Sequence, residues 1–503
     1  MVRNILRRTP LLALGVLLLP GAAVAQVTGE QVAQMADAER SNLPPSTFGG
    51  ELGFNGLGGD YFLTLALRLN FDQSNWGFGL QVPLRLRLID NDPQNDLDYG
   101  GILRREDWDE PSDWLRVLRY VYLGQWDKKG PYYVRLGELS GLTVGHGTIM
   151  HRYFNGIDPS KWRTGLNVAV NIDAYGGEAM VNDLADPYLV GARFTVRPLM
   201  VAMGEGEEEA WLTKKLVLGA SIFADGKAPF ELGTETVQVP NPDAPDSPIT
   251  TTRIRNDEHG RPLVTRERAL VFLGVDIGLE LLSTDFFSIT PYTDLNKMSQ
   301  VSGGWGWHAG VLWNLRVPLA IDTLTVDLRT EYRRVAGDYL APYFNTVYEI
   351  ERYQRLQPGS SAASVTKLRS LCGDLECNGN GVPGRNGVFL ELLAGLPNFA
   401  VVGGDYTAYS GDNQDGTLRL TLEVPALQVV KFSAFYYRVN VAGLNDLFKL
   451  DDKSAIVAQA SVPLYTVFSI NARWWRVWQA TPDGIGYESV DDYSIGVGLS
   501  LEL

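Results

Sequence analysis

The sequence predicts an all-β protein, a single transmembrane antiparallel up-and-down β-barrel of about 18 to 20 strands. Three observations predict it. Runs of about 11 to 13 residues alternate apolar with polar or small side chains, short connections alternate with long ones, and prolines recur where strands end. No apolar run of about 18 residues occurs after the amino-terminal leader, so the chain offers no membrane-spanning helix there.

The first 25 residues have the layout of a secretory signal peptide. Three arginines precede a short apolar stretch from Leu11 to Leu19, and Ala23-Val24-Ala25 supplies small residues before a cleavage position. The apolar stretch is too short to cross a bilayer as a helix. We expect residues 1–25 to be removed on export, which takes the formal net charge from −15 to −18 because three arginines and no acidic residues leave.

The rest of the chain divides into an arm and the barrel. We expect residues 26–46 to form a short periplasmic arm, with a helical turn or two around Val32 to Met35, and residues 47–503 to form the barrel. The acidity of the chain argues against a nucleic-acid partner, which calls for a basic face. We find no nucleotide-binding glycine loop, no Gly-x-Ser-x-Gly elbow and no His-Glu-x-x-His motif. We therefore expect neither a cofactor nor an enzymatic activity.

Alternation with a period of two is the main signal. Successive side chains of a strand point to opposite faces, so the pattern gives each strand one apolar and one polar face. The last segment shows it from Tyr493 to Leu503, and residues 61–71 and 76–88 show it again. The candidate strands lie near 47–56, 60–71, 76–88, 113–126, 131–141, 165–173, 177–182, 188–199, 213–225, 267–282, 286–297, 304–317, 321–334, 387–397, 399–410, 417–424, 428–440, 452–463, 466–479 and 491–503.

Connection lengths and prolines assign the two ends of the predicted barrel. Short turns at one end and long loops at the other are typical of barrels in bacterial outer membranes, and an even strand number places both chain ends on the periplasmic side. The long connections include 142–164, 226–266 and 335–386, and we expect them on the outer side. Proline cannot donate to a strand ladder, so it belongs at a strand end. Five prolines are predicted to share the periplasmic rim: Pro198, Pro318, Pro397, Pro425 and Pro463.

This pattern resembles the porin-like outer-membrane barrels of Gram-negative bacteria, over nearly the whole mature chain but without a family-specific motif. In those proteins the last strand, with a terminal aromatic residue, is read by the barrel-assembly machinery; Gly498, Leu501 and Leu503 take the matching places here. The resemblance implies an outer-membrane location and contact with lipid and lipopolysaccharide. It also implies either self-association or association with envelope-complex proteins. The cluster of Trp474, Trp475 and Trp478 fits an interfacial girdle, with Trp474 on the lipid face and Trp475 on the same face as Arg473.

Charged residues fall on the face opposite the apolar one. Ionised groups cannot remain in dry hydrocarbon, so they indicate a wet or internally paired interior. Two interpretations stay open: a pore lining that selects solutes by charge, or paired charges that brace a wide barrel. The predicted lumen-facing charges are Arg68, Arg85, Arg87, Asp327, Arg329, Glu331, Arg333, Arg419, Glu423, Lys431 and Arg473.

The connection 335–386 is the best candidate for a constriction or a partner-binding element. Tyr343, Val347 and Ile350 follow helical spacing within it. In the resembling porins a long loop folds back into the lumen, whereas the alternative is an outward surface loop. Cys372 and Cys377, the only cysteines, stand close together in a Gly/Asn-rich stretch, and in an exported protein such a pair predicts a local disulfide.

Two of the four histidines, His146 and His151, lie in a glycine-bounded loop. Such a pair can bind a metal or act as a base, but no acidic or serine partner stands at a recognisable spacing. We therefore expect ordinary loop residues, with no catalytic and no metal site. A calcium-loop echo from Asp374 fails because its twelfth position is Arg385.

A barrel of this width leaves an aqueous lumen unless loops or another protein fill it. The leading hypothesis is an outer-membrane channel for small hydrophilic solutes. The alternative is a barrel that acts as anchor or conduit in a multiprotein envelope assembly for surface-polymer export, motility or adhesion. A barrel enzyme resting on His146 and His151 is the third hypothesis.

Overall fold

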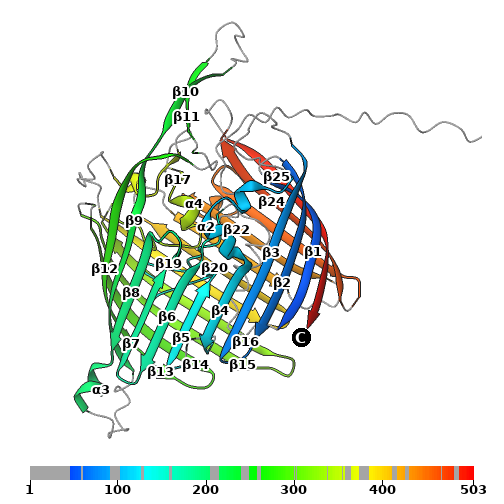
Figure 1. Ribbon diagram of the computed structural model, residues 1–503. Coiled ribbons are helices and arrows are strands. Elements are labelled where there is room, and N and C mark those ends of the chain that lie inside the picture. The colour runs from blue at the N-terminus through cyan, green and yellow to red at the C-terminus, as the bar shows by residue number, and fades with distance from the viewer. Residues whose placement is uncertain are drawn as a thin grey trace, which may run out of the picture.

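The computed structural model describes residues 46–502, except 58–59, 91–101, 126–127, 129, 158–160, 204–214, 240–248, 256, 258–261, 300, 302, 337, 354, 357–363, 373–383, 411–415, 425–429, 466 and 481–486. Its strands wind around a common axis as a closed barrel (Figure 1). Over the described residues the sheet has 21 strands, one of them a two-residue fragment beside its neighbour. The barrel is closed because the first strand pairs with both the second and the last.

All barrel pairings are antiparallel and follow chain order, so the predicted fold class is confirmed. The strands are β1 (Thr47–Leu57), β2 (Asp60–Asp72), β3 (Trp76–Ile89), β4 (Leu118–Gly124), β5 (Tyr132–Gly137), β6 (Gly165–Ile172), β7 (Tyr175–Val181), β8 (Leu189–Val196), β9 (Leu216–Leu232), β12 (Val264–Leu279), β13 (Leu282–Ser283), β14 (Phe287–Met298), β15 (Trp305–Pro318), β16 (Thr323–Val335), β19 (Arg385–Leu396), β20 (Ala400–Tyr409), β21 (Gly416–Val424), β22 (Lys431–Val441), β23 (Ser454–Pro463), β24 (Phe468–Ala480) and β25 (Tyr487–Glu502).

Every candidate strand of the sequence has a counterpart in the barrel, and the differences lie at strand ends. β4 begins later than predicted because two short helical turns, α2 (Pro111–Trp114) and η3 (Leu115–Val117), precede it. The excursion after β9 contains a hairpin of β10 (Thr234–Val239) and β11 (Ile249–Ile254), which stands beyond the barrel rim (Figure 1).

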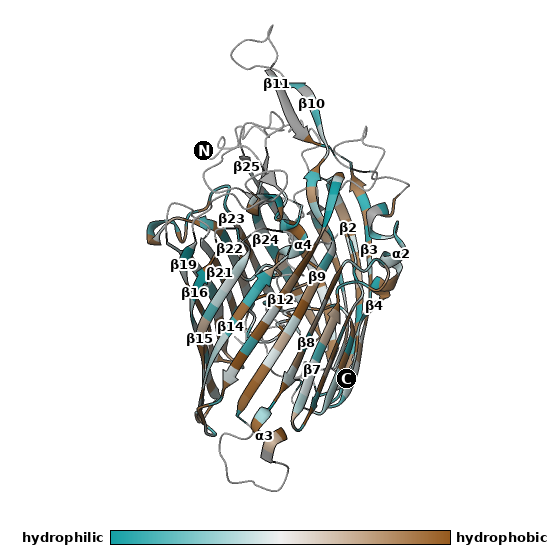
Figure 2. Ribbon diagram, turned by 90° about the vertical axis from the view of Figure 1, so that its left-hand side faces the viewer, coloured by the Kyte–Doolittle hydropathy of each residue, from teal (hydrophilic) through white to brown (hydrophobic). Residues whose placement is uncertain are grey.

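The alternating pattern separates two faces of the barrel wall. On β12, Leu273, Val275 and Ile277 are 51%, 55% and 46% exposed, while Phe272 and Asp276 on the opposite face are buried. The same arrangement recurs around the barrel, and apolar segments run across its outside (Figure 2). A belt of exposed apolar side chains is the surface that lipid covers in a transmembrane barrel. Among the described residues, no helix combines the length and apolar character needed to cross a membrane.

The predicted proline rim is confirmed for four of its five members. Pro198 opens the short helix α3 (Pro198–Met203) directly below β8, Pro318 and Pro463 are the last residues of β15 and β23, and Pro397 follows β19. Pro425 lies outside the described residues. These strands all run toward the end of the barrel where the chain terminates, beside the short turns and α3 (Figure 1). Proline is tolerated there because no further ladder bond is needed.

Two long connections fold into the barrel. We call the described residues of 138–164, between β5 and β6, the first inner loop, and those of 336–372, between β16 and β19, the second inner loop. They touch through a parallel bridge between Met150 and Phe344, where His151 N–H donates to the Phe344 carbonyl at 2.9 Å. Together with lumen-facing residues of β8, β9 and β12 they form the largest buried apolar cluster, in which Phe223, Phe272 and Phe344 are essentially buried.

The expectation that every long connection lies outside the barrel is therefore wrong for these two. The physical reason is their composition: residues such as Ile149, Met150 and Phe344 would expose apolar area to water on an outer surface. The helical spacing in the second inner loop produces only one turn, α4 (Tyr348–Glu351). Cys377 lies outside the described residues, so the disulfide with Cys372 stays a prediction.

Large lumen-side aromatics lie over glycines of the neighbouring strand. A Cβ on Gly191 of β8 would stand 2.3 Å from the Phe223 ring of β9, and one on Gly310 of β15 would stand 2.4 Å from the Tyr292 ring of β14. These glycines are required because the rings occupy the space of a side chain. Because these positions are glycines, the aromatic rings can lie against the backbone of the neighbouring strand, between the barrel wall and the inner loops.

Replacing Gly191 by alanine is therefore expected to destabilise the barrel by about 1–3 kcal/mol, the usual effect of overpacking a filled site. Phe223 is 1% exposed and packs against Phe344, so its ring has no free space to enter. Denaturant unfolding of the reconstituted protein measures the effect. Gly443→Ala is the matched control, because a Cβ at Gly443 meets nothing within 4 Å; equal midpoints for the two variants would contradict the packing account.

Candidate functional site: a constriction inside the barrel

A buried carboxylate joins the two inner loops. Glu349 of α4 is 1% exposed and accepts hydrogen bonds from the hydroxyls of Tyr153 in the first inner loop and Tyr188 beside β8. The guanidiniums of Arg163 and Arg352 lie 3.5 and 3.7 Å from it. Burial opposes ionisation of Glu349, but the two guanidiniums and two hydroxyls outweigh it and hold its pKa below the usual value. Glu349 therefore remains charged inside the barrel.

The pKa of Glu349 predicts how acid affects the constriction. Because the folded pKa lies below the ordinary 4.5, the stabilisation by this carboxylate is complete above pH 4.5 and is lost as the pH falls below that value. We expect the inner loops to loosen only at a pH below 4.5, which protease cleavage within residues 336–372 reports. A Glu349→Gln variant should lack this acid step; an identical step in the variant would contradict the assignment.

The second inner loop is also fastened to the barrel wall. Tyr348 donates a hydrogen bond to Asp225 of β9 at 2.5 Å, and Arg352 lies 3.2 Å from the same carboxylate. On the far side, Glu351 pairs with Lys367 at 2.6 Å and accepts a hydrogen bond from Tyr437 of β22 at 2.8 Å. The loop is thus held by strands on different sides of the lumen.

A second apolar cluster completes the crossing. Phe154 of the first inner loop and Val347 of the second pack with lumen-facing Phe435, Val457 and Trp475 of β22, β23 and β24. The first cluster lies against β8, β9 and β12, so the inner loops extend from one wall to another. They narrow the lumen, which supports the constriction interpretation over the surface-loop one.

Three predicted lumen charges form one fully buried wall cluster. Glu331 of β16 pairs with Arg329 and Arg333, each at 2.5 Å. His308 of β15 lies 3.0 Å from it, and the Tyr292 hydroxyl donates to it. Arg333 also donates to the carbonyl of Ala341 in the second inner loop at 2.6 Å. In this cluster the charges pair with one another, as the bracing interpretation expects.

The other predicted charges lie on the lumen face with partners of opposite sign or in partial exposure. Glu423 and Arg68 are half-buried, and Lys431 is exposed. The pairs are Arg85 with Asp107 at 2.6 Å, Arg87 with Asp90 at 2.5 Å, Asp327 with Arg316 at 2.7 Å, Arg419 with Asp405 at 2.6 Å, and Arg473 with Glu51 at 3.2 Å. Pairing reduces the net field that these groups present to a solute.

Asp107, in the short turn η2 (Arg105–Asp107), receives three guanidiniums. Arg85 of β3, Arg104 and Arg116 lie 2.6, 2.7 and 3.2 Å from its Oδ1. Burial opposes ionisation of Asp107, but the three cations outweigh it and hold its pKa well below the usual range. This cluster attaches the segment before β4 to the upper part of β3.

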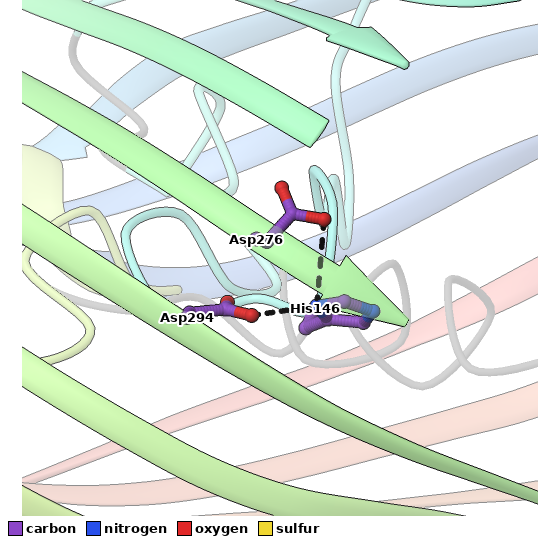
Figure 3. A group of neighbouring side chains, drawn as sticks. All are labelled: His146, Asp276 and Asp294. Atoms are coloured by element: carbon purple, nitrogen blue, oxygen red, sulfur yellow. Dashed lines mark hydrogen bonds and ion pairs between the residues drawn. The ribbon is translucent and has the colours of Figure 1, made fainter. Parts of the chain in front are cut away.

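The glycine-bounded turn of the first inner loop presses His146 against β12 and β14 (Figure 3). Its Nδ1 lies 2.8 Å from Asp294 Oδ1 and 3.9 Å from Asp276 Oδ1. Gly145 and Gly147 have φ of +62° and +75°, a left-handed conformation that glycine adopts without strain. The glycines are thus needed by the turn itself, as the sequence indicated.

His151 finds an acidic partner as well. Its Nε2 lies 3.3 Å from Glu391 of β19, whose Oε1 also pairs with Arg152 at 2.7 Å. The carboxylates beside both histidines lie more than a hundred residues away in the chain, so no short sequence motif could predict these contacts. Sequence reasoning likewise missed Glu349, Asp225 and Asp107. For Glu349 and Asp225 the available signal was an acidic residue next to apolar ones, whereas Asp107 stands in a run of charged residues and carries no such signal.

Comparisons with known proteins give fold-level similarity alone. No protein-family model matches the chain, and no curated protein matches it. The crystal structure of Pseudomonas aeruginosa OccK11 (OpdR) shares 12% identity at a TM-score of 0.30, covering 92% of this chain and 99% of that one. Wzi, an Escherichia coli outer-membrane carbohydrate-binding β-barrel involved in group 1 capsule assembly, shares 11% at 0.32, covering 94% and 87%. P. aeruginosa OprD, an outer-membrane protein, shares 10% at 0.28, covering 91% and 94%.

Proposed function

We propose that this protein is an outer-membrane channel for small hydrophilic solutes, with a lumen narrowed by the two inner loops. The observation that supports it is a closed barrel with an apolar outer belt, whose lumen is crossed by two loops that buried ion pairs hold in place. A barrel of this strand number is wide enough for an aqueous lumen. Loops fixed inside such a lumen set the size and chemistry of what passes.

The lumen wall where the first and last strands pair is lined by polar side chains, which favours passage of polar solutes. Half-buried amides line β1, β2 and β24 at Asn55, Asn70 and Asn471. Thr64 donates to Asn55 at 2.6 Å, and Arg473 donates to the side-chain oxygen of Gln459 at 3.2 Å. A solute on this side meets hydrogen-bonding groups and charges that are already paired.

We therefore expect weak ion selectivity. In a tenfold potassium chloride gradient, the reversal potential of the reconstituted channel should stay within about 15 mV of zero, against the roughly 59 mV per tenfold gradient of a perfectly selective pore. Paired charges contribute little net field at the ion path. Asp405→Asn, which removes the carboxylate that pairs with Arg419 at 2.6 Å, should move the potential toward anion selectivity. Strong selectivity of the wild type would contradict the paired-lumen account.

Conductance across planar bilayers tests the channel itself. Folded protein, verified by its altered migration on gels before heating, should produce discrete current steps, and heat-denatured protein at the same concentration should not. A variant in which residues 338–371 are replaced by a short Gly/Ser linker should give larger steps. Silence of both folded proteins would reject an aqueous pore.

The proposed function requires that the protein is exported and inserted into the outer membrane. The leader (1–25), the periplasmic arm (26–46) except its last residue, Ser46, and Leu503 lie outside the described residues. On β25, Leu501 is outward and exposed, and Gly498 faces the lumen. We propose that these two residues and Leu503 serve as the assembly signal of the last strand, with leucine where an aromatic residue is usual. We propose that outer-membrane lipid and lipopolysaccharide cover the apolar belt. Recovery of the protein in the soluble periplasmic fraction would contradict this.

The second candidate, an anchor or conduit in an envelope assembly, is favoured by one observation. The β10–β11 hairpin stands beyond the rim, where it contributes nothing to the wall (Figure 1). If partners bind it, stoichiometric co-purifying proteins should disappear when residues 234–254 are replaced by a short linker. A channel alone would purify without them.

A further inference from the structure

Three potential metal ligands from three elements converge beside the first inner loop. His146 comes from the loop, Asp276 from β12 and Asp294 from β14, and one ligand atom from each lies within 4.8 Å of the others (Figure 3). Zinc binds imidazole nitrogen and carboxylate oxygen at about 2.0–2.2 Å, so ligand atoms about 3–4 Å apart suit one ion. We propose that this triad binds a divalent transition-metal ion that fastens the first inner loop to the barrel wall.

Each carboxylate is already oriented by a second residue. Arg193 of β8 donates to both oxygens of Asp276, at 3.0 and 2.6 Å. Thr148 donates to Asp294 Oδ2 at 2.6 Å and itself accepts from Asn296 at 3.0 Å. The Asp294 oxygen that faces His146 is the other one, Oδ1. Such outer hydrogen bonds fix ligand geometry in metal sites, and carboxylate oxygens retain lone pairs for an ion.

The wall leaves room for the triad at two glycines. A Cβ on Gly219 of β9 would stand 2.2 Å from an Asp276 oxygen, and one on Gly278 of β12 would stand 3.0 Å from His146 Nε2. The imidazole stacks on Tyr292 with ring centroids 4.3 Å apart, which holds its plane. Because both positions are glycines, no side chain at either of them obstructs the approach of His146 to the two carboxylates.

Charge and ligand type decide the class of ion. Two carboxylates and the Arg193 guanidinium leave one net negative charge, which a divalent cation reverses. Without an ion, the contact of 2.8 Å between His146 Nδ1 and Asp294 Oδ1 requires a proton between them; the ion replaces that proton. An imidazole ligand selects zinc and its neighbours, because calcium and magnesium take oxygen ligands.

Zinc titration by calorimetry tests the site. The protein is solubilised in detergent without a histidine tag and treated with chelator, and every sample carries His259→Gln so that this histidine cannot bind zinc. It should bind one Zn²⁺ per chain. His146→Gln and Asp294→Asn should each weaken binding at least tenfold, whereas His151→Gln, five residues away in the same loop, should leave it unchanged.

A spectroscopic readout distinguishes the triad from scattered surface binding. Cobalt(II) in the same protein should give visible absorption bands of a protein-bound ion, absent in His146→Gln, while gel migration shows that each variant is folded. The proposal is overturned if folded His146→Gln binds Zn²⁺ as the wild type does, or if the wild type shows no saturable binding below about 1 mM. These measurements report metal binding and not the passage of solutes. A negative result would therefore overturn the metal site without bearing on the proposed channel function.

Discussion

Replacing Glu349 by glutamine is expected to release the inner loops from their position in the lumen. The change removes the negative charge between Arg163 and Arg352, which are 1% and 3% exposed, and leaves two buried guanidiniums without this counter-charge. Breaking a buried pair in this way costs about 3–5 kcal/mol. The second inner loop then depends on its remaining contacts to the wall, so we expect it to leave its position more often.

Two measurements report the release. Single-channel recordings should show larger or more frequently fluctuating current steps, and proteolysis should cleave within residues 336–372, which the wild type protects. Asp446→Asn is the matched control, since that carboxylate pairs with Lys449 on an exposed turn and its loss should change neither readout. Unchanged currents and protection in Glu349→Gln would show that the remaining contacts, the apolar clusters and the bonds of Tyr348 to Asp225 and of Tyr437 to Glu351, hold the loops without Glu349.

The barrel itself could be predicted from the sequence, because its physical basis is local. A strand that separates lipid from water must alternate along its length, and Leu273, Val275 and Ile277 show that alternation directly. Prolines at the rim, such as Pro318 and Pro463, mark strand ends for a reason that is also local.

The interior could not be predicted in the same way. Glu349 meets Arg163, and His146 meets Asp294, only after the chain has closed a cylinder, so neither pair has a characteristic spacing. The inner loops have no regular period, since their apolar residues fill irregular space between strands. Their apolar content was the available signal: a segment with Met150, Phe154 and Ile157 is unsuited to an outer surface.

Replacing Glu331 by glutamine is expected to weaken the barrel wall, in contrast to the Glu349 variant, which acts on the loops. Glu331 is fully buried between Arg329 and Arg333 and accepts from Tyr292, so a neutral side chain leaves two guanidiniums buried without their common partner. The expected loss is about 3–5 kcal/mol of unfolding free energy.

Urea unfolding in lipid vesicles, followed by gel migration, measures this loss. Asp327→Asn on the same strand and the same face is the matched control: its pair with Arg316 is about one-third exposed on both sides, 33% and 38%, and solvent screening limits its worth to about 1 kcal/mol or less. The two variants remove the same charge four residues apart, so any difference between them reflects burial. Equal unfolding midpoints for the two variants would show that the buried wall cluster stabilises the barrel no more than a solvent-exposed ion pair does. The lumen charges would then not brace the barrel.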